Sequence, residues 1–270
     1  MRVGTMETAT STIRFVTERG IVVPAVDSAQ MREVDRIAVE ETGPNLYQMM
    51  ENAGRNLALL AIELLGERWQ QAKVLVLAGS GGNGGGGICA ARHLANRNLT
   101  VAVCLAEPAT LRGVPEFQRK ILQSTSAKEI PHAQIKHQQP DLVLDALIGY
   151  GLNAAPQGQV ADLIASTASY RAPVLALDVP SGVDATSGQT PGVFVSPRWT
   201  LTLALPKTGL LPRLTGELYL GDIGIPNQVY SRIGIKYVSP FGPHSWVRLR
   251  NDEISNDSGK TQATGSGRTP

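Results

Sequence analysis

The sequence predicts an α/β fold, in which a doubly wound and mainly parallel sheet carries helices on both faces. Short apolar runs alternate along the chain with longer segments of helical periodicity, as in successive strand–helix–strand units. Glycine supplies 28 of 270 residues and is concentrated directly after the first of these apolar runs. The chain is 42% hydrophobic and long enough to bury a large core without disulfides.

The individual elements follow from periodicity and from breaking residues. A helix is expected over Ser28–Glu41, with Ser28 as its cap. Apolar runs that are continuous rather than alternating are typical of parallel strands buried on both faces. The runs of this kind are Lys73–Ala78, Thr100–Ala106, Asp141–Ala146, Pro173–Leu177, Thr200–Leu205 and Glu217–Leu220, and further helices are expected over Leu46–Leu65, Ile88–Asn96 and Val160–Ser169.

Both ends of the chain are expected to lie outside the folded domain. Residues 1–22 contain no apolar stretch of signal-peptide length and are interpreted as a disordered or loosely attached N-terminus. Residues 249–270 are nearly all polar or small and are interpreted as a polar disordered tail. Residues 23–248 would form the single domain.

Composition excludes several classes of partner. The 25 basic and 23 acidic residues leave a net charge of +2, and no basic run forms a patch, so no nucleic-acid partner is expected. No apolar run approaches the roughly 20 residues of a membrane span, so no membrane partner is expected either. Cys89 and Cys104 both lie in apolar segments, which favours buried thiols and a cytoplasmic location.

The glycine cluster after the first strand predicts an anion-binding cradle. It comprises Gly79, Ser80, Gly81, Gly82, Asn83, Gly84, Gly85, Gly86 and Gly87. Backbone N–H groups that no Cβ obstructs can turn toward a phosphate, and the following helix adds its positive end. The P-loop pattern is absent because no Lys-Ser/Thr pair follows. The dinucleotide pattern G-x-G-x-x-G is met, but so many glycines satisfy almost any spacing, and a flexible turn without a ligand remains an alternative.

Acidic, hydroxyl and basic residues follow the other strands. Asp145 and Asp178 end two apolar strands, where a buried carboxylate is costly unless it binds a cation, a donor or a proton. Lys207 follows the strand predicted at Thr200–Leu205 and could face the same crevice. Ser181 is not expected to be a hydrolase nucleophile, because no G-x-S-x-G turn surrounds it. His93, on a predicted helix, is expected to be packed or at the surface rather than catalytic.

Taken in order, these segments resemble the NAD(P)H-hydrate epimerase family. The resemblance spans about 200 residues, and the order and spacing of its blocks are specific. The matching blocks are Met31-Arg32, Leu46 to Gly54, Leu77–Leu94, Asp145–Gly151, Asp178–Asp184, Pro206–Leu210 and Gly221–Pro226.

The resemblance implies a Rossmann-like fold and the repair of a damaged cofactor. Members of the family epimerise hydrated NADH or NADPH at C6 of the nicotinamide ring, and a separate dehydratase then restores the cofactor. The implied ligands of a potassium ion are Asn83, Asp145 and Ser181, whose oxygens suit a hard cation. The implied substrate-binding residues are Gly82, Asn83, Gly84, Gly85, Gly86, Gly149, Tyr150, Gly151, Leu152, Asn153, Ala154, Ala155 and Asp178. The partners expected are hydrated NAD(P)H and a dehydratase acting in sequence, with a homodimer left open.

The chemistry also suits one positioned carboxyl group. Protonation of the C6 hydroxyl lets the ring nitrogen expel water, and water can then return to either face. Asp178 is assigned this acid-and-base role as a hypothesis, with Lys207 as an electrostatic helper.

Several positions depart from the family pattern. The usual Asn-Asn-Gly-Gly-Asp-Gly has Gly82 for its first Asn and Gly86 for its Asp. Tyr150 replaces the usual Thr of the second motif, and Ala154 and Ala155 replace a basic residue and a proline. Two alternatives therefore stay open: a noncatalytic member of the family that binds nucleotides or a protein, and a dinucleotide-dependent oxidoreductase, for which the chain offers little room for a substrate domain.

Overall fold

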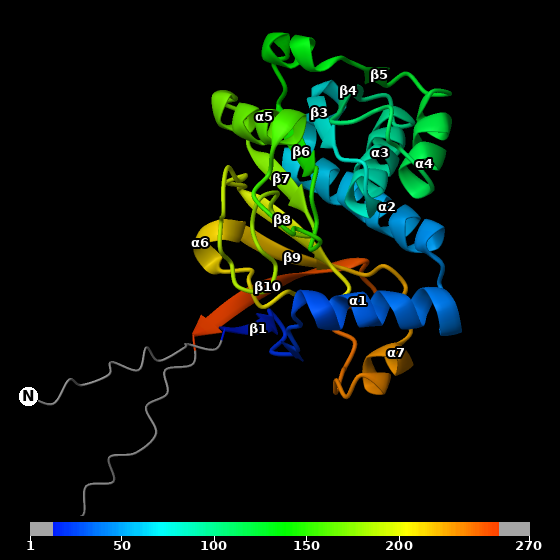
Figure 1. Cartoon of the computed structure of the whole chain (residues 1–270), viewed down its shortest axis with the longest axis vertical. Helices are drawn as coiled ribbons and strands as arrows, with labels where there is room; N and C mark the ends of the chain where they lie inside the picture. The colour runs from blue at the N-terminus through cyan, green and yellow to red at the C-terminus, as the bar shows by residue number, and fades with distance from the viewer. Residues whose placement is uncertain (1–12, 254–270) are drawn as a thin grey trace, which may run out of the picture.

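Strands of the computed structural model, which describes residues 13–253, form a single mixed sheet (Figure 1). Among these residues the sheet has ten strands in the order β2-β1-β10-β9-β8-β7-β6-β3-β4-β5. Neighbours from β5 to β9 pair in parallel, and β9, β10, β1 and β2 pair antiparallel. The strands are β1 (Ile13–Thr17), β2 (Val22–Val23), β3 (Lys73–Ala78), β4 (Thr100–Leu105), β5 (Lys128–Glu129), β6 (Leu142–Ala146), β7 (Val174–Leu177), β8 (Trp199–Leu203), β9 (Glu217–Gly221) and β10 (Trp246–Glu253).

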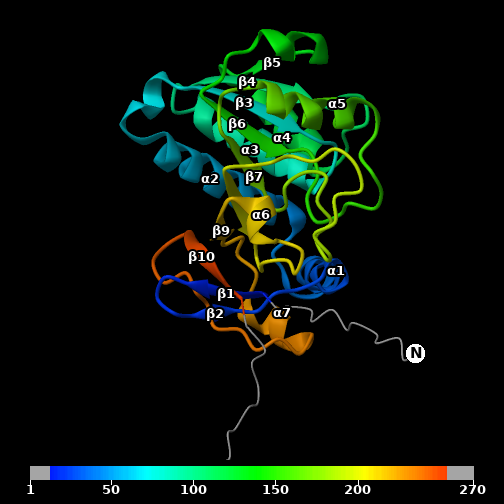
Figure 2. The same cartoon turned by 90° about the vertical axis from the view of Figure 1, so that its left-hand side faces the viewer.

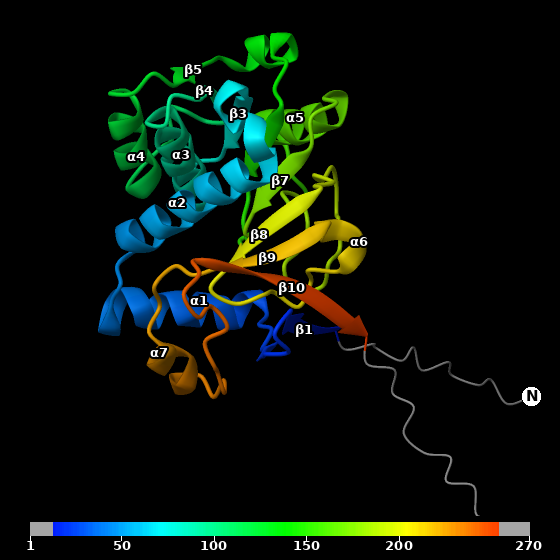
Figure 3. The same cartoon turned by 180° about the vertical axis from the view of Figure 1, so that it is seen from behind.

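Helices cover both faces of the parallel part, as the sequence predicts (Figures 1 and 3). One apolar core joins the sheet to α1 through α4, and a second, smaller core on the other face contains Leu163 and Ile164 of α5. The helices are α1 (Ser28–Ile37), α2 (Leu46–Leu65), α3 (Gly82–Ala95), α4 (Val114–Leu122), α5 (Gly158–Ser166), α6 (Pro212–Thr215) and α7 (Asn227–Arg232), with a π-helical turn at Ala38–Thr42 and 3₁₀ turns at Gly66–Gln71, His132–His137 and Thr167–Ser169.

The first helix begins one residue away from its predicted cap. Asp27, not Ser28, is the N-cap of α1, because its carboxylate accepts from the backbone N–H of Gln30 and the Gln30 side chain accepts from the N–H of Asp27. Met31, Val34 and Ile37 form the buried face. The helix proper ends at Ile37, and the predicted end at Glu41 falls within the π-helical turn.

The glycine cluster is largely helical rather than a loop. The sequence predicts that the helix begins near Ile88, whereas α3 begins at Gly82. Glycine has low helix propensity, but packing outweighs it here. A Cβ atom on Gly84 would lie 1.9 Å from the carbonyl oxygen of Gly79, so only glycine permits this close approach of helix and loop.

The sheet includes segments that the sequence places outside the domain. Residues 13–17 form β1, which pairs with β10 in a register that joins Ile13 to Glu253, and β2 lies within the predicted loose N-terminus at Val22 (Figure 2). β10 extends to Glu253, past the predicted boundary at residue 248. The structure places residues 13–17 and 249–253 in the sheet, where the two strands pair with each other and contribute Phe15 and Leu249 to the apolar core. The remaining parts of both predicted ends, residues 1–12 and 254–270, lie outside the described residues.

The order of the central strands locates a crevice. From β3 the chain proceeds outward to β4 and β5, then returns to β6 on the other side of β3 and continues to β7, β8 and β9. Ligands of doubly wound sheets bind beyond the carboxyl ends of the strands at such a reversal, here between β3 and β6. In the part of the chain that the structure describes, no helix combines the length and apolarity needed to cross a bilayer.

Candidate active site

A cavity of about 890 Å³ lies at this reversal of strand order. Its volume is in the range of small-molecule and cofactor sites. The loops after β3, β6 and β7 and one side of α1 supply its wall, with Asn83, Tyr150, Asp178, Lys207 and Asp35 among the lining residues. The structure therefore brings together the strand ends that the sequence singles out.

Asp178 and Lys207 form a buried ion pair in this cavity. Their side chains are 6% and 1% exposed, and Lys207 Nζ donates to Asp178 Oδ1. The same ammonium group donates to the carbonyl oxygen of Leu203 over 2.9 Å. Lysine is rarely buried without a partner, so the pair explains why this side chain lies inside the protein.

The backbone around Asp178 fixes the direction of its carboxylate. Asp178 has a φ of +66°, a left-handed conformation that is uncommon outside glycine, and its N–H donates to the carbonyl oxygen of Leu201 over 2.7 Å. Asp178 Oδ2 accepts from the N–H of Tyr150 over 3.0 Å. A Cβ atom on Gly149 would lie 2.9 Å from the same oxygen, so the approach of this loop requires glycine.

The first turn of α3 faces the cavity with unsatisfied donors. Gly81 is the N-cap and supplies no side-chain acceptor. The first intrahelical donor after it is the N–H of Gly85, which donates to the carbonyl oxygen of Gly81. Gly82 and Asn83 line the cavity with N–H groups that have no partner inside a helix. This end of a 14-residue helix can bind an anionic group of a ligand.

Several residues that the resemblance implies as substrate contacts do not line the cavity. Gly84, Gly85 and Gly86 face the interior instead: Cβ atoms on Gly85 and Gly86 would lie 2.9 Å from Val114 Cγ1 and 2.8 Å from Leu177 Cδ2. These three positions lie where α3 packs on its neighbours, and their contact with a substrate stays a prediction. In the second motif Gly149, Tyr150, Gly151 and Asn153 line the cavity, whereas Leu152, Ala154 and Ala155 do not.

Asp145 and Ser181 lie in contact beneath the cavity floor. Ser181 Oγ donates to Asp145 Oδ1 over 2.6 Å, and the N–H of Ser181 donates to Oδ2 over 2.9 Å. Burial raises the pKa of Asp145 to about 6, an effect that these hydrogen bonds partly offset. The Asn83 amide lies near Gly149, and its buried Nδ2 has no hydrogen-bond partner among the described residues. Of the three residues implied as cation ligands, Asp145 and Ser181 are therefore in contact, and Asn83 lies in the adjacent cavity wall.

Sequence reasoning missed the acidic residue of α1. Asp35 lies on the cavity side of that helix, where its Oδ2 accepts from the hydroxyl of Tyr150 over 2.5 Å. Arg32 and Arg36, one turn and one residue away on the same helix, also line the cavity. The only signal in the sequence is the helical spacing of these polar residues beside the buried Met31 face.

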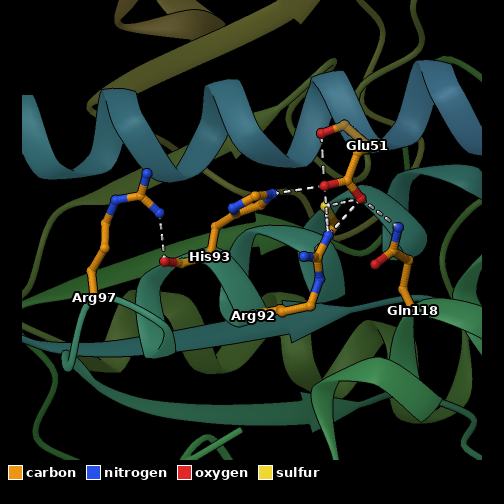
Figure 4. Close-up of polar contacts among 6 residues, drawn as sticks. Glu51, Arg92, His93, Arg97 and Gln118 are labelled. Atoms are coloured by element: carbon orange, nitrogen blue, oxygen red, sulfur yellow. Dashed lines mark hydrogen bonds and ion pairs between the residues drawn. The ribbon is translucent and has the colours of Figure 1, made fainter. Parts of the chain in front are cut away.

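A second cluster of polar side chains lies between α2, α3 and α4 (Figure 4). Ligand atoms of Glu51, Cys89 and His93 lie within 4.8 Å of one another, a spacing compatible with a metal site. However, Arg92 Nη2 lies 2.7 and 2.5 Å from the two Glu51 oxygens and 3.3 Å from Cys89 Sγ. A guanidinium group therefore occupies the position of a cation, and the cluster is a structural ion pair in which His93 is packed, as the sequence predicts.

The fold and the cavity together define a doubly wound α/β protein with a ligand site at the reversal of its strand order. The family model described as "YjeF-related protein N-terminus" matches residues 46–209, more than half of the chain. The chain belongs to this family.

Curated relatives extend over most of the chain. It is 53% identical over 242 residues to a protein of Dehalogenimonas lykanthroporepellens named NAD(P)H-hydrate epimerase. The aligned region covers 89% of this chain and 99% of the relative. A protein of the same name from Truepera radiovictrix is 35% identical over 83% of this chain and 100% of the relative. A third relative, the bifunctional NAD(P)H-hydrate repair enzyme Nnr of Moorella thermoacetica, is 35% identical over 76% of this chain but only 41% of its own length.

A solved structure has the same fold. Yeast ynu0 superposes with a TM-score of 0.74, covering 84% of this chain and 100% of that one at 20% identity. This likeness confirms the α/β architecture that the sequence predicts.

Proposed function

We propose that this chain epimerises the R and S forms of hydrated NADH and NADPH at C6 of the nicotinamide ring. The observation that carries the proposal is the buried Asp178–Lys207 pair at the floor of a cavity that also holds the N-terminus of α3. Membership of the family and the name of its 53% identical relative support it.

The reaction needs a group that can give and take a proton beside the ring. C6 carries both the ring nitrogen and a hydroxyl group, so protonation of the hydroxyl lets the nitrogen lone pair expel water and form a C=N bond. Water can return to either face of that carbon, which exchanges the two epimers. Asp178 is the proposed proton carrier, and Lys207 holds its carboxylate in place.

The cofactor would be bound through the two motifs that line the cavity. Backbone N–H groups at Gly82 and Asn83 would bind the diphosphate, because the helix end offers donors and a positive dipole. Gly149, Tyr150, Gly151 and Asn153 would contact the nicotinamide half beside Asp178. The remaining implied contacts, which do not line the cavity, would act by packing α3 and the second motif.

Potassium is proposed as the ion of this site. Asp145 accepts hydrogen bonds from the uncharged donors of Leu147 and Ser181, and the buried Nδ2 of Asn83 has no partner among the described residues. An amide can turn its oxygen toward a cation, and carboxylate, amide and hydroxyl oxygens are ligands that hard cations accept. When bound, the ion would supply positive charge beneath the cavity. Asn83, Asp145 and Ser181 would hold it.

A dehydratase acting in sequence is the proposed functional partner. Relatives named bifunctional NAD(P)H-hydrate repair enzyme are more than twice as long as the matched region, so they contain a further domain. A homodimer stays a prediction.

The test is turnover of purified R-hydrated NADH in an assay coupled to a dehydratase specific for the S epimer. Formation of NADH above the rate of spontaneous epimerisation, faster in potassium than in sodium, is the expected result. Asp178→Asn is the matched control, since it keeps the shape of the side chain. Binding of the cofactor without turnover would favour a noncatalytic member of the family.

A further inference from the structure

Tyr150 joins two acidic groups of the cavity. Its hydroxyl donates to Asp35 Oδ2 over 2.5 Å, and its backbone N–H donates to Asp178 Oδ2 over 3.0 Å. Asp35 comes from α1 and Asp178 from the end of β7, so one residue of the loop after β6 connects them. Asp35 and Tyr150 are both half-buried and both line the cavity.

The surroundings of Asp35 favour the protonated form of its carboxyl group more than water does. Burial raises the pKa of Asp35, the Tyr150 hydrogen bond and the charge of Lys207 oppose the rise, and the charge of Asp178 adds to it. Tyr230 of α7 also faces Asp35.

The phenol beside it is a donor over the whole working range of pH. Burial raises the pKa of Tyr150 above its usual range, the hydrogen bond to Asp35 and the charge of Asp178 add to the rise, and the charge of Arg32 opposes it. Lys207 Nζ lies 5.8 Å from the centre of the Tyr150 ring, which holds the ring between two fixed groups.

Asp178 has different surroundings. Its oxygens already accept from Lys207 Nζ, from the N–H of Leu203 and from the N–H of Tyr150. The cavity thus contains one carboxylate surrounded by donors and one carboxyl group whose hydrogen-bond partner is a phenol. Two acids whose environments differ in this way can divide acid and base roles between them.

We propose that Tyr150 is a second catalytic residue, whose hydroxyl delivers a proton to the C6 hydroxyl oxygen, and that Asp35 is the positioning residue that resupplies it. This inference rests on the proposed function. In the structure the phenol donates to Asp35 Oδ2. Protonation of Asp35 would reverse this hydrogen bond, since a carboxylic acid donates to the phenolic oxygen, and the phenolic proton would then be free to point at the ligand.

The proton balance then needs no further reactant. As the phenolic proton moves to the C6 hydroxyl oxygen, the C6–O bond breaks, its electron pair leaves with water, and the nitrogen lone pair forms the C=N bond. Tyr150 takes the proton of Asp35. When water adds to the other face, a new C6–O bond forms, the C=N pair returns to nitrogen, and the proton lost by that water passes to Asp178. Exchange with solvent restores both carboxyl groups.

The test compares Tyr150→Phe, Asp35→Asn and Asp35→Glu with the parent chain in the coupled assay across pH. Tyr150→Phe keeps the ring and the backbone N–H, so kcat is expected to fall about 100-fold or more with KM within a few-fold. Asp35→Asn still accepts the phenolic hydrogen bond but has no acidic proton to resupply Tyr150, so kcat is expected to fall. The decrease of kcat at high pH, which reports deprotonation of Asp35, is expected to disappear. Asp35→Glu restores part of kcat and that decrease at high pH.

Ser28→Ala is the matched control. Ser28 Oγ donates to the backbone carbonyl oxygen of Tyr150 over 3.4 Å, so this change touches Tyr150 without altering the hydrogen bond of its hydroxyl group. It is expected to turn over within twofold of the parent. Thermal midpoints show that each variant is folded. Parent-like kcat in Tyr150→Phe, or an unchanged pH profile in Asp35→Asn, overturns the inference while the proposed function stands. An inactive parent chain overturns both.

Discussion

The ammonium group of Lys207 and the carboxylate of Asp178 neutralise each other at a point where both side chains are almost completely buried. Lys207 comes from the loop after β8, and the N–H of Thr208 beside it donates to the carbonyl oxygen of Val26, ahead of α1. The ion pair therefore connects the strand ends of the sheet to the segment that leads into the cavity wall.

Removal of one partner is expected to destabilise the protein strongly. Lys207→Met leaves a buried carboxylate without its counter-ion, at a cost of about 3–5 kcal/mol in the free energy of unfolding. The double variant Lys207→Met with Asp178→Asn should lose less than the sum of the two single variants, since no charge is stranded. Urea unfolding of the four proteins measures the coupling, and strict additivity would contradict it.

Asp178→Asn is expected to abolish epimerisation and also to lower the free energy of unfolding, because the buried Lys207 loses its counter-ion. Thermal midpoints define the conditions in which the variant is folded, and activity is compared there. Asparagine tolerates the left-handed backbone at this position and still accepts from Lys207, but it cannot give and recover a proton. The measurements are kcat in the coupled assay and calorimetric affinity for hydrated cofactor. Turnover within a few-fold of the parent would reduce Asp178 to a binding residue.

Gly82→Asn is expected to tighten cofactor binding. A side chain at this position has room, since the nearest neighbour of a Cβ atom would be Met50 Sδ at 3.9 Å. The added amide can hydrogen-bond the ligand, whereas Gly82→Ala, the matched control, adds helix propensity without a polar group. Both variants should gain about 0.4–1 kcal/mol in stability, and only Gly82→Asn should gain affinity by calorimetry. Equal affinities in the two variants would contradict the prediction.

The Glu51 cluster is expected to give a defined dependence of stability on acid pH. Burial opposes ionisation of Glu51, but hydrogen bonds from Arg92, Gln118, His93 and Cys89 outweigh it and lower the pKa to about 2. A carboxyl group with a lowered pKa stabilises the fold fully above its unfolded value near 4.5, and this contribution is lost as pH falls toward 2.

The measurement is the difference in free energy of unfolding between the parent and Glu51→Gln. That difference should be constant above pH 4.5 and shrink steadily toward pH 2. The partial exposure of Glu51 reduces its size. Glu116→Gln, a change at an exposed acid of α4, should show no such trend. A difference independent of pH would assign the role of Glu51 to packing alone.

Potassium is expected to raise the thermal midpoint at constant ionic strength. An ion that binds only the folded state stabilises it by about 2.7 kcal/mol at 100 times its dissociation constant. Asp145→Ala should abolish the difference between potassium and lithium chloride, whereas Asp162→Ala, on the exposed side of α5, should retain it. Identical midpoints of the parent in the two salts would exclude potassium at this site.

The central strands could be predicted from the sequence because strands buried on both faces consist of continuous apolar residues. β3 and β6 are buried on both faces, so their continuous apolar runs identify them without ambiguity. The acidic residues that end β6 and β7 follow from the same reasoning, since topology brings parallel strand ends to one edge.

The edge strands and part of the site could not be predicted in this way. β1 is half-polar and depends on pairing with β10 at the opposite end of the sequence, which no local pattern records. The hydrogen bond from Tyr150 to Asp35 joins residues 115 positions apart. The start of α3 was missed because glycine disfavours helix locally, and the close packing of Gly84, Gly85, Gly86 and Gly87 compensates.

The pairing of Ile13 with Glu253 also constrains the order in which the protein folds. The parallel units around β3, β4 and β6 close short loops and can form while the ribosome is still adding residues. The pairing of β1 with β10 cannot, because β1 must wait until the distant β10 has been synthesised. Until β10 is available the edge of β9 stays exposed, and during that interval the nascent chain is vulnerable to aggregation through this edge.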